Sequence, residues 1–193
     1  DRHLDVGPGR GYFLERSGLA SGSMVTILDP NTNVLRHVSA RLGGLDVSGA
    51  EADVCKPLPL EGPFDSASLN LVIHCLPGPF ERKASAVANV AAVMAPDGVL
   101  FGSSVIGTSG SHNAVAKTLL RAYNRRGAFD NLEDSKEAIG QMLASSFEEV
   151  EVDTSLGRSW TRGAWRRRRL TSASRTAPIR CHSSGISPPI FRL

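Results

Sequence analysis

The chain has 193 residues, 41% of them hydrophobic, which suits one domain with a buried core. No stretch of about 18 apolar residues occurs, so the sequence predicts no membrane-spanning helix. The net charge of +3 is unevenly spread: residues 1–156 carry 13 basic and 19 acidic side chains, whereas residues 157–193 carry nine arginines and no acid.

The three cysteines, Cys55, Cys75 and Cys181, lie far apart in the sequence. An odd and sparse set gives neither a disulfide framework nor the spacing of a zinc site, and it is typical of a reducing compartment. The chain opens without a charged and then apolar leader. We therefore expect a cytoplasmic protein without a metal.

Strand-like and helix-like patterns alternate along residues 1–156. The second helix begins at Asn31, which can cap it, and ends at Gly43 and Gly44. The expected strands are residues 2–6, 24–29, 45–53, 64–78 with an exit loop, 99–107 and 148–157. The expected helices are residues 12–20, 31–44, 81–98, 111–127 and 134–147.

Regular alternation of strands and helices predicts a mostly parallel sheet with helices on both faces. In such sheets, ligands bind beyond the carboxyl ends of the strands. A glycine-rich stretch, Asp29, Asp53 and residues 70–74 all follow expected strands. The sequence therefore predicts a binding site where these segments converge.

Residues 157–193 have neither a strand nor a helix period, and they are rich in Arg, Ser and Pro. We interpret them as a basic, disordered tail that follows a domain of residues 1–156. Residues 166–169 are four arginines next to Trp160 and Trp165, which could bind nucleic acid through phosphate contacts and base stacking. A tail that is merely basic is the simpler interpretation, so nucleic acid is not expected as a partner.

The stretch Leu4–Phe13 carries glycines at every second position, Gly7, Gly9 and Gly11, directly after a strand. A strand, glycine loop and helix form a cradle for adenine cofactors, because glycines let the main chain approach the ligand. The nicotinamide pattern places its third glycine one residue later, where Tyr12 stands. Asp5 disfavours a pyrophosphate but suits an ammonium group, so the loop predicts a cofactor with an amino-acid end.

The segment "HLDVGPGRGYF" resembles motif one of the class I S-adenosylmethionine-dependent methyltransferases, and "VTILDPN" resembles motif two. "EADVCKPLP" and "FDSASLNLVIHCLPG" are similar to the segments after the third strand and around the fourth. The resemblance covers about residues 3–155. It implies a Rossmann-like α/β fold and S-adenosyl-L-methionine as cofactor.

The resemblance also implies roles for individual residues. The loop of Gly7, Gly9 and Gly11 would pack against the methionine moiety and ribose, with Asp5 near the amino group. Asp29, followed by Pro30, would bind the ribose hydroxyls. Asp53 would meet the adenine amine while Val54 packs on the ring, and Leu69 and Asn70 would lie beside the cofactor.

His74 follows the fourth strand and could take a proton from the methyl acceptor as a general base. The alternative is that His74 packs in the exit loop, hydrogen-bonded to backbone, and Cys75 is interpreted as a small core residue. His112 and Asn113 could line an acceptor pocket or cap the next helix. "HCLPG", together with residues 123–131, is similar to small-molecule methyltransferases, which implies a small-molecule acceptor; the latter segment is a substrate lid or a connector.

Two departures from the family pattern lead to an alternative function. Only Asp1–His3 precede motif one, where the family carries helices, so we expect a domain truncated at its N-terminus. The family's last antiparallel strand should follow residue 157, but arginines are costly between two sheet neighbours. We expect that strand to be missing. The alternative is a non-catalytic methyltransferase-like domain that binds cofactor weakly or acts as a scaffold.

Overall fold

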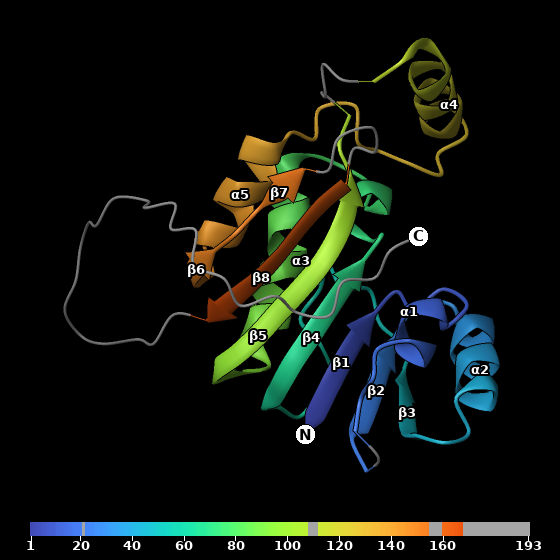
Figure 1. The fold of residues 1–193 in the computed structure, drawn as a ribbon, viewed down its shortest axis with the longest axis vertical. Helices are drawn as coiled ribbons and strands as arrows, with labels where there is room; N and C mark the ends of the chain where they lie inside the picture. The colour runs from blue at the N-terminus through green and yellow to red at the C-terminus, as the bar shows by residue number, and fades with distance from the viewer. Residues whose placement is uncertain (21, 108–111, 155–159, 168–193) are drawn as a thin grey trace.

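The computed structural model describes residues 1–20, 22–107, 112–154 and 160–167, which form one mixed sheet with helices on both faces (Figure 1). The strand order is β3-β2-β1-β4-β5-β8-β6, and β7 pairs with β8. The strands are β1 (Arg2–Val6), β2 (Met24–Leu28), β3 (Asp46–Ala50), β4 (Phe64–Asn70), β5 (Met94–Val105), β6 (Phe147–Val150), β7 (Asp153–Thr154) and β8 (Trp160–Arg167). Strands β1–β5 pair in parallel, which confirms the predicted α/β architecture.

Helices of different length connect these strands. They are α1 (Tyr12–Glu15), α2 (Thr32–Arg41), α3 (Phe80–Ala92), α4 (Ala114–Arg125) and α5 (Lys136–Ala144), and a 3-10 turn, η1 (Ile73–Cys75), follows β4. Asn31 caps α2 as predicted, because its side chain accepts from the Asn33 N–H at 3.0 Å. No helix among the described residues is long and apolar enough to cross a membrane.

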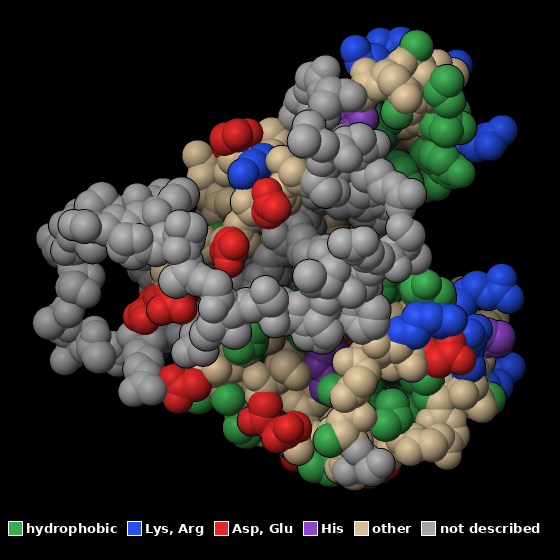
Figure 2. All heavy atoms as spheres, in the orientation of Figure 1, with side chains coloured by type: hydrophobic (Ala, Val, Ile, Leu, Met, Phe, Trp, Pro, Cys, Tyr) green, Lys and Arg blue, Asp and Glu red, His purple; other side chains and the backbone are tan. Residues whose placement is uncertain are grey.

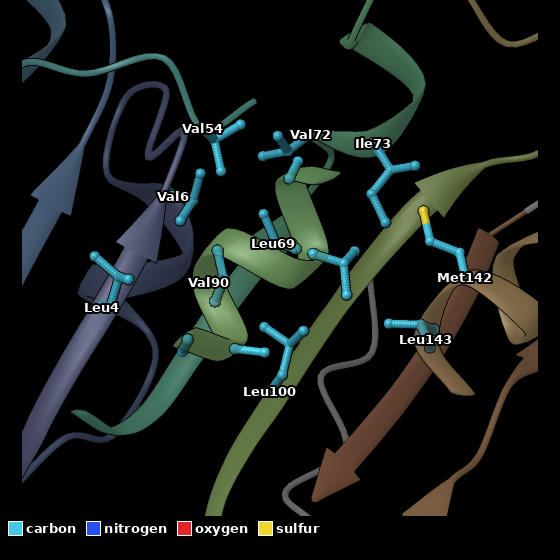
Figure 3. Packing of buried hydrophobic residues seen from close by; sticks show 14 of the residues in the cluster. Leu4, Val6, Val54, Leu69, Val72, Ile73, Val90, Leu100, Met142 and Leu143 are labelled. Atoms are coloured by element: carbon cyan, nitrogen blue, oxygen red, sulfur yellow. The ribbon is translucent and has the colours of Figure 1, made fainter. Parts of the chain in front are cut away.

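The larger core lies on the face of the sheet that α3 and α5 cover (Figure 3). Leu4 and Val6 of β1, Leu69 of β4 and Leu100 of β5 point toward Val90 of α3. A smaller core on the opposite face joins α1 and α2 to β2 through Leu14, Val25, Ile27, Leu35, Val38 and Leu42. Alternate residues of each central strand therefore serve different faces.

Several elements differ from their predicted bounds: α1 ends at Glu15 rather than at residue 20, and the strand predicted over residues 148–157 is divided into β6 and β7. The difference at α3 and β5 has a local reason. Helix α3 ends at Ala92, and β5 already begins at Met94, because the Phe64 N–H bonds the Val93 carbonyl at 2.9 Å and the strands pair from there. The pairing then shifts register before Val99. Pro96 thus lies in an irregular strand rather than at a helix end.

The expectation that the last antiparallel strand is missing is wrong. Strand β8 lies between β5 and β6 and is antiparallel to both, and Val99–Val105 pair with it residue by residue. Main-chain groups make these bonds, and residues 160–167 include no proline, so an apolar run is not required. Strand β8 falls inside the segment interpreted as a tail; residues 157–159 and 168–193 of that segment lie outside the described residues.

Candidate functional site

The glycine loop after β1 is a tight turn with an open side. Gly7, Gly9 and Gly11 all have positive φ angles of 64°, 57° and 77°. The Gly7 N–H donates to the Leu28 carbonyl at 2.8 Å and the Gly11 N–H to the Pro8 carbonyl at 2.8 Å. A Cβ on Gly7 would lie 2.8 Å from Val72, whereas a Cβ on Gly9 would meet nothing within 4 Å. No neighbouring atom therefore covers the backbone at Gly9 on this side, and a ligand can approach it.

Asp5 lies directly before this loop and is only 3% exposed. The Ser68 hydroxyl donates to its Oδ1. Burial raises the pKa of Asp5 to about 7, against the opposing effect of the Ser68 hydrogen bond. An ammonium group placed next to this carboxyl would favour its ionised form.

Asp29 follows β2 and holds the start of the next turn. Its Oδ1 accepts from the Asn31 N–H at 2.8 Å, and partial burial raises its pKa. Pro30, beside it, is exposed. The carboxylate thus stands half-exposed at the strand end, where a ligand can reach it.

The segment after β3 places one acid in a turn and one valine in the core. Asp53 Oδ1 accepts from the Cys55 N–H at 2.9 Å, and its Oδ2 lies 3.6 Å from an Arg82 guanidinium nitrogen. Val54 is 5% exposed and belongs to the larger core, next to Val6 and Val72 in Figure 3. The proposed packing of Val54 on an adenine ring stays a prediction.

Of the two candidate residues at the end of β4, Leu69 is buried and Asn70 is partly exposed. The Leu69 side chain is fully buried, so only its backbone can contact a ligand. The Asn70 amide oxygen accepts from the Ser103 hydroxyl at 3.3 Å, and Leu71 follows with a φ of 63°. This left-handed residue turns the chain sharply at the site edge.

His74 lies in η1 with its ring buried, 3% exposed. The Val105 N–H donates to its Nδ1 at 3.3 Å, so the neutral ring carries its proton on Nε2. Burial, and then the charge of Lys83, lowers the pKa of His74 to about 4. This geometry agrees with the packing alternative and does not favour the base role, because Nδ1 already accepts a backbone hydrogen bond.

The segment between α4 and α5 is held firmly against the sheet. Asn131, 1% exposed, donates to the Val105 carbonyl at 2.7 Å, and the Asp130 N–H donates to the His74 carbonyl at 2.9 Å. Phe129 lies edge-on to the His74 ring, with centroids 4.5 Å apart. The connector interpretation of residues 123–131 therefore fits these contacts.

A buried cation fixes the same segment from α3. Lys83 is 3% exposed, and its ammonium lies 2.7 Å and 2.9 Å from the two carboxylate oxygens of Asp134. It also donates to the Asp130 carbonyl. Sequence reasoning missed Lys83, although its spacing from Ala86, Val87 and Val90 places it on the apolar stripe of α3.

Of three other candidates, Asn113 and His112 have structural roles and Cys75 is exposed to solvent. The Asn113 side chain accepts from the Ala116 N–H at 2.8 Å and caps α4, and His112 Nε2 donates to the Ile106 carbonyl at 2.9 Å. Cys75 is exposed, so its interpretation as a core residue is wrong; partial burial of its thiol raises the pKa. It lies at the end of the short η1, where the chain leaves the core.

Parallel pairing brings the glycine loop, Asp29, Asp53 and Asn70 to the same edge of the sheet, as predicted. No group of three or more His, Cys, Asp or Glu side chains in the described part of the chain could hold a metal. Sequence reasoning missed His3, Ser66 and Ser68, which form a hydrogen-bonded line that ends at Asp5. The sequence pattern that could have revealed them is a polar residue at every second position of two buried strands, which places these side chains on one face of the sheet.

Residues 4–102 match the family described as "Methyltransferase domain". The chain is 34% identical over 166 residues to demethylluteothin O-methyltransferase of Streptomyces thioluteus, covering 82% of this chain and 72% of that protein. It is 35% identical over 151 residues to the N-methyltransferase vrtF of Penicillium aethiopicum, covering 78% and 63%.

The N-methyltransferase NodS from Bradyrhizobium japonicum WM9, solved with S-adenosyl-L-homocysteine, shares the fold. Its TM-score is 0.66 at 19% identity, covering 86% of this chain and 78% of that chain. The sheet order and the glycine loop thus define a class I α/β methyltransferase. The chain belongs to the methyltransferase domain family, and its cofactor is S-adenosylmethionine.

The residues present fit this cofactor. Gly9 leaves open space where a Cβ would stand, so a ligand can lie on the loop. Asp5 supplies a buried carboxyl for an ammonium group, and Asp29 supplies a half-exposed carboxylate suited to hydroxyl donors. The acids and the bare backbone lie at the carboxyl edge of the sheet, where open α/β sheets bind their ligands.

Proposed function

We propose that this methyltransferase transfers a methyl group to a small-molecule acceptor, a metabolite with a reactive oxygen or nitrogen. The two relatives described above are named as an O-methyltransferase and an N-methyltransferase. The observation that carries the proposal is the open glycine loop between two carboxyl groups, Asp5 and Asp29. Strand β8 completes the sheet, which removes one reason for the non-catalytic alternative.

The cofactor, when bound, supplies a methyl group on a positively charged sulfur that is already activated for displacement. The chain therefore has to position the two reactants and exclude water. We assign Gly7, Gly9 and Gly11 to the methionine moiety and ribose, and Asp5 to the amino group. Asp29 with Pro30 would hold the ribose, and Asp53, Val54, Leu69 and Asn70 the adenine side and the strand edge.

His74 does not suit the role of general base in this arrangement. A base needs an unprotonated nitrogen directed at the acceptor, and Nδ1 already accepts the Val105 N–H. We propose that neutral His74 instead supports the rim of the acceptor site, where Phe129 stands edge-on to its ring.

Calorimetric titration with S-adenosyl-L-homocysteine tests the cofactor site. We expect wild-type protein to bind, and Asp29→Ala to weaken binding by about tenfold or more, because a charge-assisted hydrogen bond is lost. Asp46→Ala is the matched control, since Asp46 is exposed at the opposite end of the neighbouring strand. If both variants bind S-adenosyl-L-homocysteine with equal affinity, Asp29 does not contribute to the cofactor site.

An acceptor screen tests the transfer itself. Incubation with methyl-labelled cofactor and a panel of phenolic, carboxylic and amine metabolites should transfer label to at least one member. Binding of S-adenosyl-L-homocysteine without labelling of any acceptor would favour the non-catalytic alternative.

We also propose a cytoplasmic location and no nucleic-acid partner, as the cysteine usage and the simpler interpretation of the arginine-rich segment indicate. Cell fractionation tests the first. A nucleic-acid gel-shift assay tests the second: we expect no shift, and a shift that weakens steeply with salt would contradict the proposal.

A further inference from the structure

Four polar side chains form a line across two buried strands. His3 and Asp5 alternate on β1, and the register places Ser66 and Ser68 of β4 directly beside them. His3, Ser68 and Asp5 are 2%, 2% and 3% exposed. Strands of a sheet covered on both faces are usually apolar, so a continuous polar line at this place needs a reason.

The hydrogen bonds of this line have one consistent direction. Ser68 donates its proton to Asp5 Oδ1, so its oxygen must accept from His3 Nε2, 3.1 Å away. His3 Nδ1 then lacks a proton and accepts from the Ser66 hydroxyl at 2.8 Å. Burial lowers the pKa of His3 to about 4, which keeps the ring neutral and the direction fixed. Each donor therefore points toward Asp5.

The rest of the row around Asp5 carries no competing hydrogen-bonding group. The register places Ile27 of β2 on one side of Asp5, and Phe101 of β5 lies beyond Ser68. Phe101 stacks on the His3 ring at 5.7 Å between centroids. Donors to a carboxylate favour its ionised form, so the line opposes the effect of burial on Asp5.

Other charged groups on the adjoining elements have partners or point elsewhere. Glu15 of α1 is paired with Arg16 and Arg41, at 2.8 Å and 2.6 Å. Arg10 in the glycine loop is exposed, and Asp29 at the end of β2 bonds the Asn31 N–H. His3 is thus the titratable group connected to Asp5 by hydrogen bonds.

We propose that Ser66, His3 and Ser68 form a directed hydrogen-bond chain that favours the ionised form of Asp5 and orients it to receive the ammonium group of the cofactor. This inference rests on the proposed function, because it takes Asp5 to be the ammonium acceptor. His3, Ser66 and Ser68 are positioning residues: they act through Asp5. Cofactor affinity should fall as pH falls and Asp5 takes up a proton.

The first experiment follows the Asp5 carboxyl carbon by NMR as pH is raised in cofactor-free protein. Ser68→Ala should move the Asp5 midpoint upward by about one pH unit, because the direct donor is lost. His3→Leu should move the midpoint upward by less. His3→Gln, which keeps a donor, should bring the midpoint most of the way back to its wild-type value. Ser48→Ala is the matched control, since its hydroxyl bonds that of Thr26 at 3.1 Å on the neighbouring strand pair.

The second experiment titrates the same proteins with S-adenosyl-L-homocysteine across the same pH range. Ser68→Ala and His3→Leu should weaken binding more at low pH than at high pH, and their affinity should begin to fall at a higher pH than that of the wild type. An unchanged Asp5 midpoint in Ser68→Ala overturns the chain. An affinity loss of equal size at every pH also overturns it, because that is the result of a merely structural role.

The two experiments separate this inference from the proposed function. If the Asp5 midpoint shifts as expected but wild-type protein binds no S-adenosyl-L-homocysteine at any pH, the proposed function and the ammonium-receiving role of Asp5 both fail. If the wild type binds and the midpoint does not move, only the hydrogen-bond chain fails.

Discussion

At the scale of single residues, the glycine loop offers a test that separates folding from binding. Gly9 and Gly18 both have positive φ angles, 57° and 68°, and a Cβ on either would meet nothing within 4 Å. Alanine at either position should therefore cost about 1 kcal/mol of backbone strain. Only Gly9→Ala should also weaken S-adenosyl-L-homocysteine binding, by about tenfold or more, because its methyl group occupies the approach to the loop.

Chemical denaturation measures the strain of each glycine variant, and calorimetry measures its binding. Gly18→Ala serves as the control, since it carries the same strain after α1 rather than in the loop. If both variants bind the ligand equally well, Gly9 does not face the cofactor, and the loop must hold it by another route.

At the scale of elements, the buried pair of Lys83 and Asp134 joins α3 to the segment before α5. Lys83→Met leaves the Asp134 carboxyl without its buried counter-charge and should cost about 3–5 kcal/mol of unfolding free energy. Arg82→Met is the control on the same helix, because its pair with Asp53 is 3.6 Å long and largely exposed. It should change stability by less than about 1 kcal/mol.

Urea denaturation of the cofactor-free proteins measures both effects. The double variant Lys83→Met with Asp134→Leu should recover part of the loss, because neither charge then remains buried. A loss of similar size in Lys83→Met and Arg82→Met would mean that the segment is held mainly by other hydrogen bonds, such as that from the Asn131 side-chain amide to the Val105 carbonyl.

Elements with a strong apolar period could be predicted from the sequence, and the exceptions have physical causes. Strands β1–β5 and helices α2–α5 lie where the sequence pattern predicts them. The acids that follow β2 and β3 converge because parallel strands end at one edge. Strand β8 could not be predicted, since its place depends on backbone pairing with β5 and β6. The polar line of His3, Ser66 and Ser68 was missed because its partners lie more than 60 residues apart.

At the scale of the whole molecule, the buried groups His3, His74 and Asp5 contribute to the pH dependence of stability. The pKa values of His3 and His74 are both lowered to about 4, whereas that of Asp5 is raised to about 7. The unfolded chain binds protons on both histidines below pH 6.5 and the folded chain does not, so stability falls as pH falls from there to 4. Asp5 has the opposite sign, since its contribution is present below pH 3.8 and is lost as pH rises through 7.

His74→Asn isolates one of these contributions. The asparagine oxygen can accept the Val105 N–H in place of Nδ1, but it does not titrate. Between pH 6.5 and 4, we expect wild-type stability to fall more steeply than that of the variant, by up to about 1.4 kcal/mol per pH unit. Urea denaturation at half-unit pH steps measures the difference, and His37→Asn at an exposed position of α2 should follow the wild type. Parallel curves for wild type and His74→Asn would mean that folded His74 takes up its proton as readily as the unfolded chain does, and that its ring is not held neutral against the end of β5.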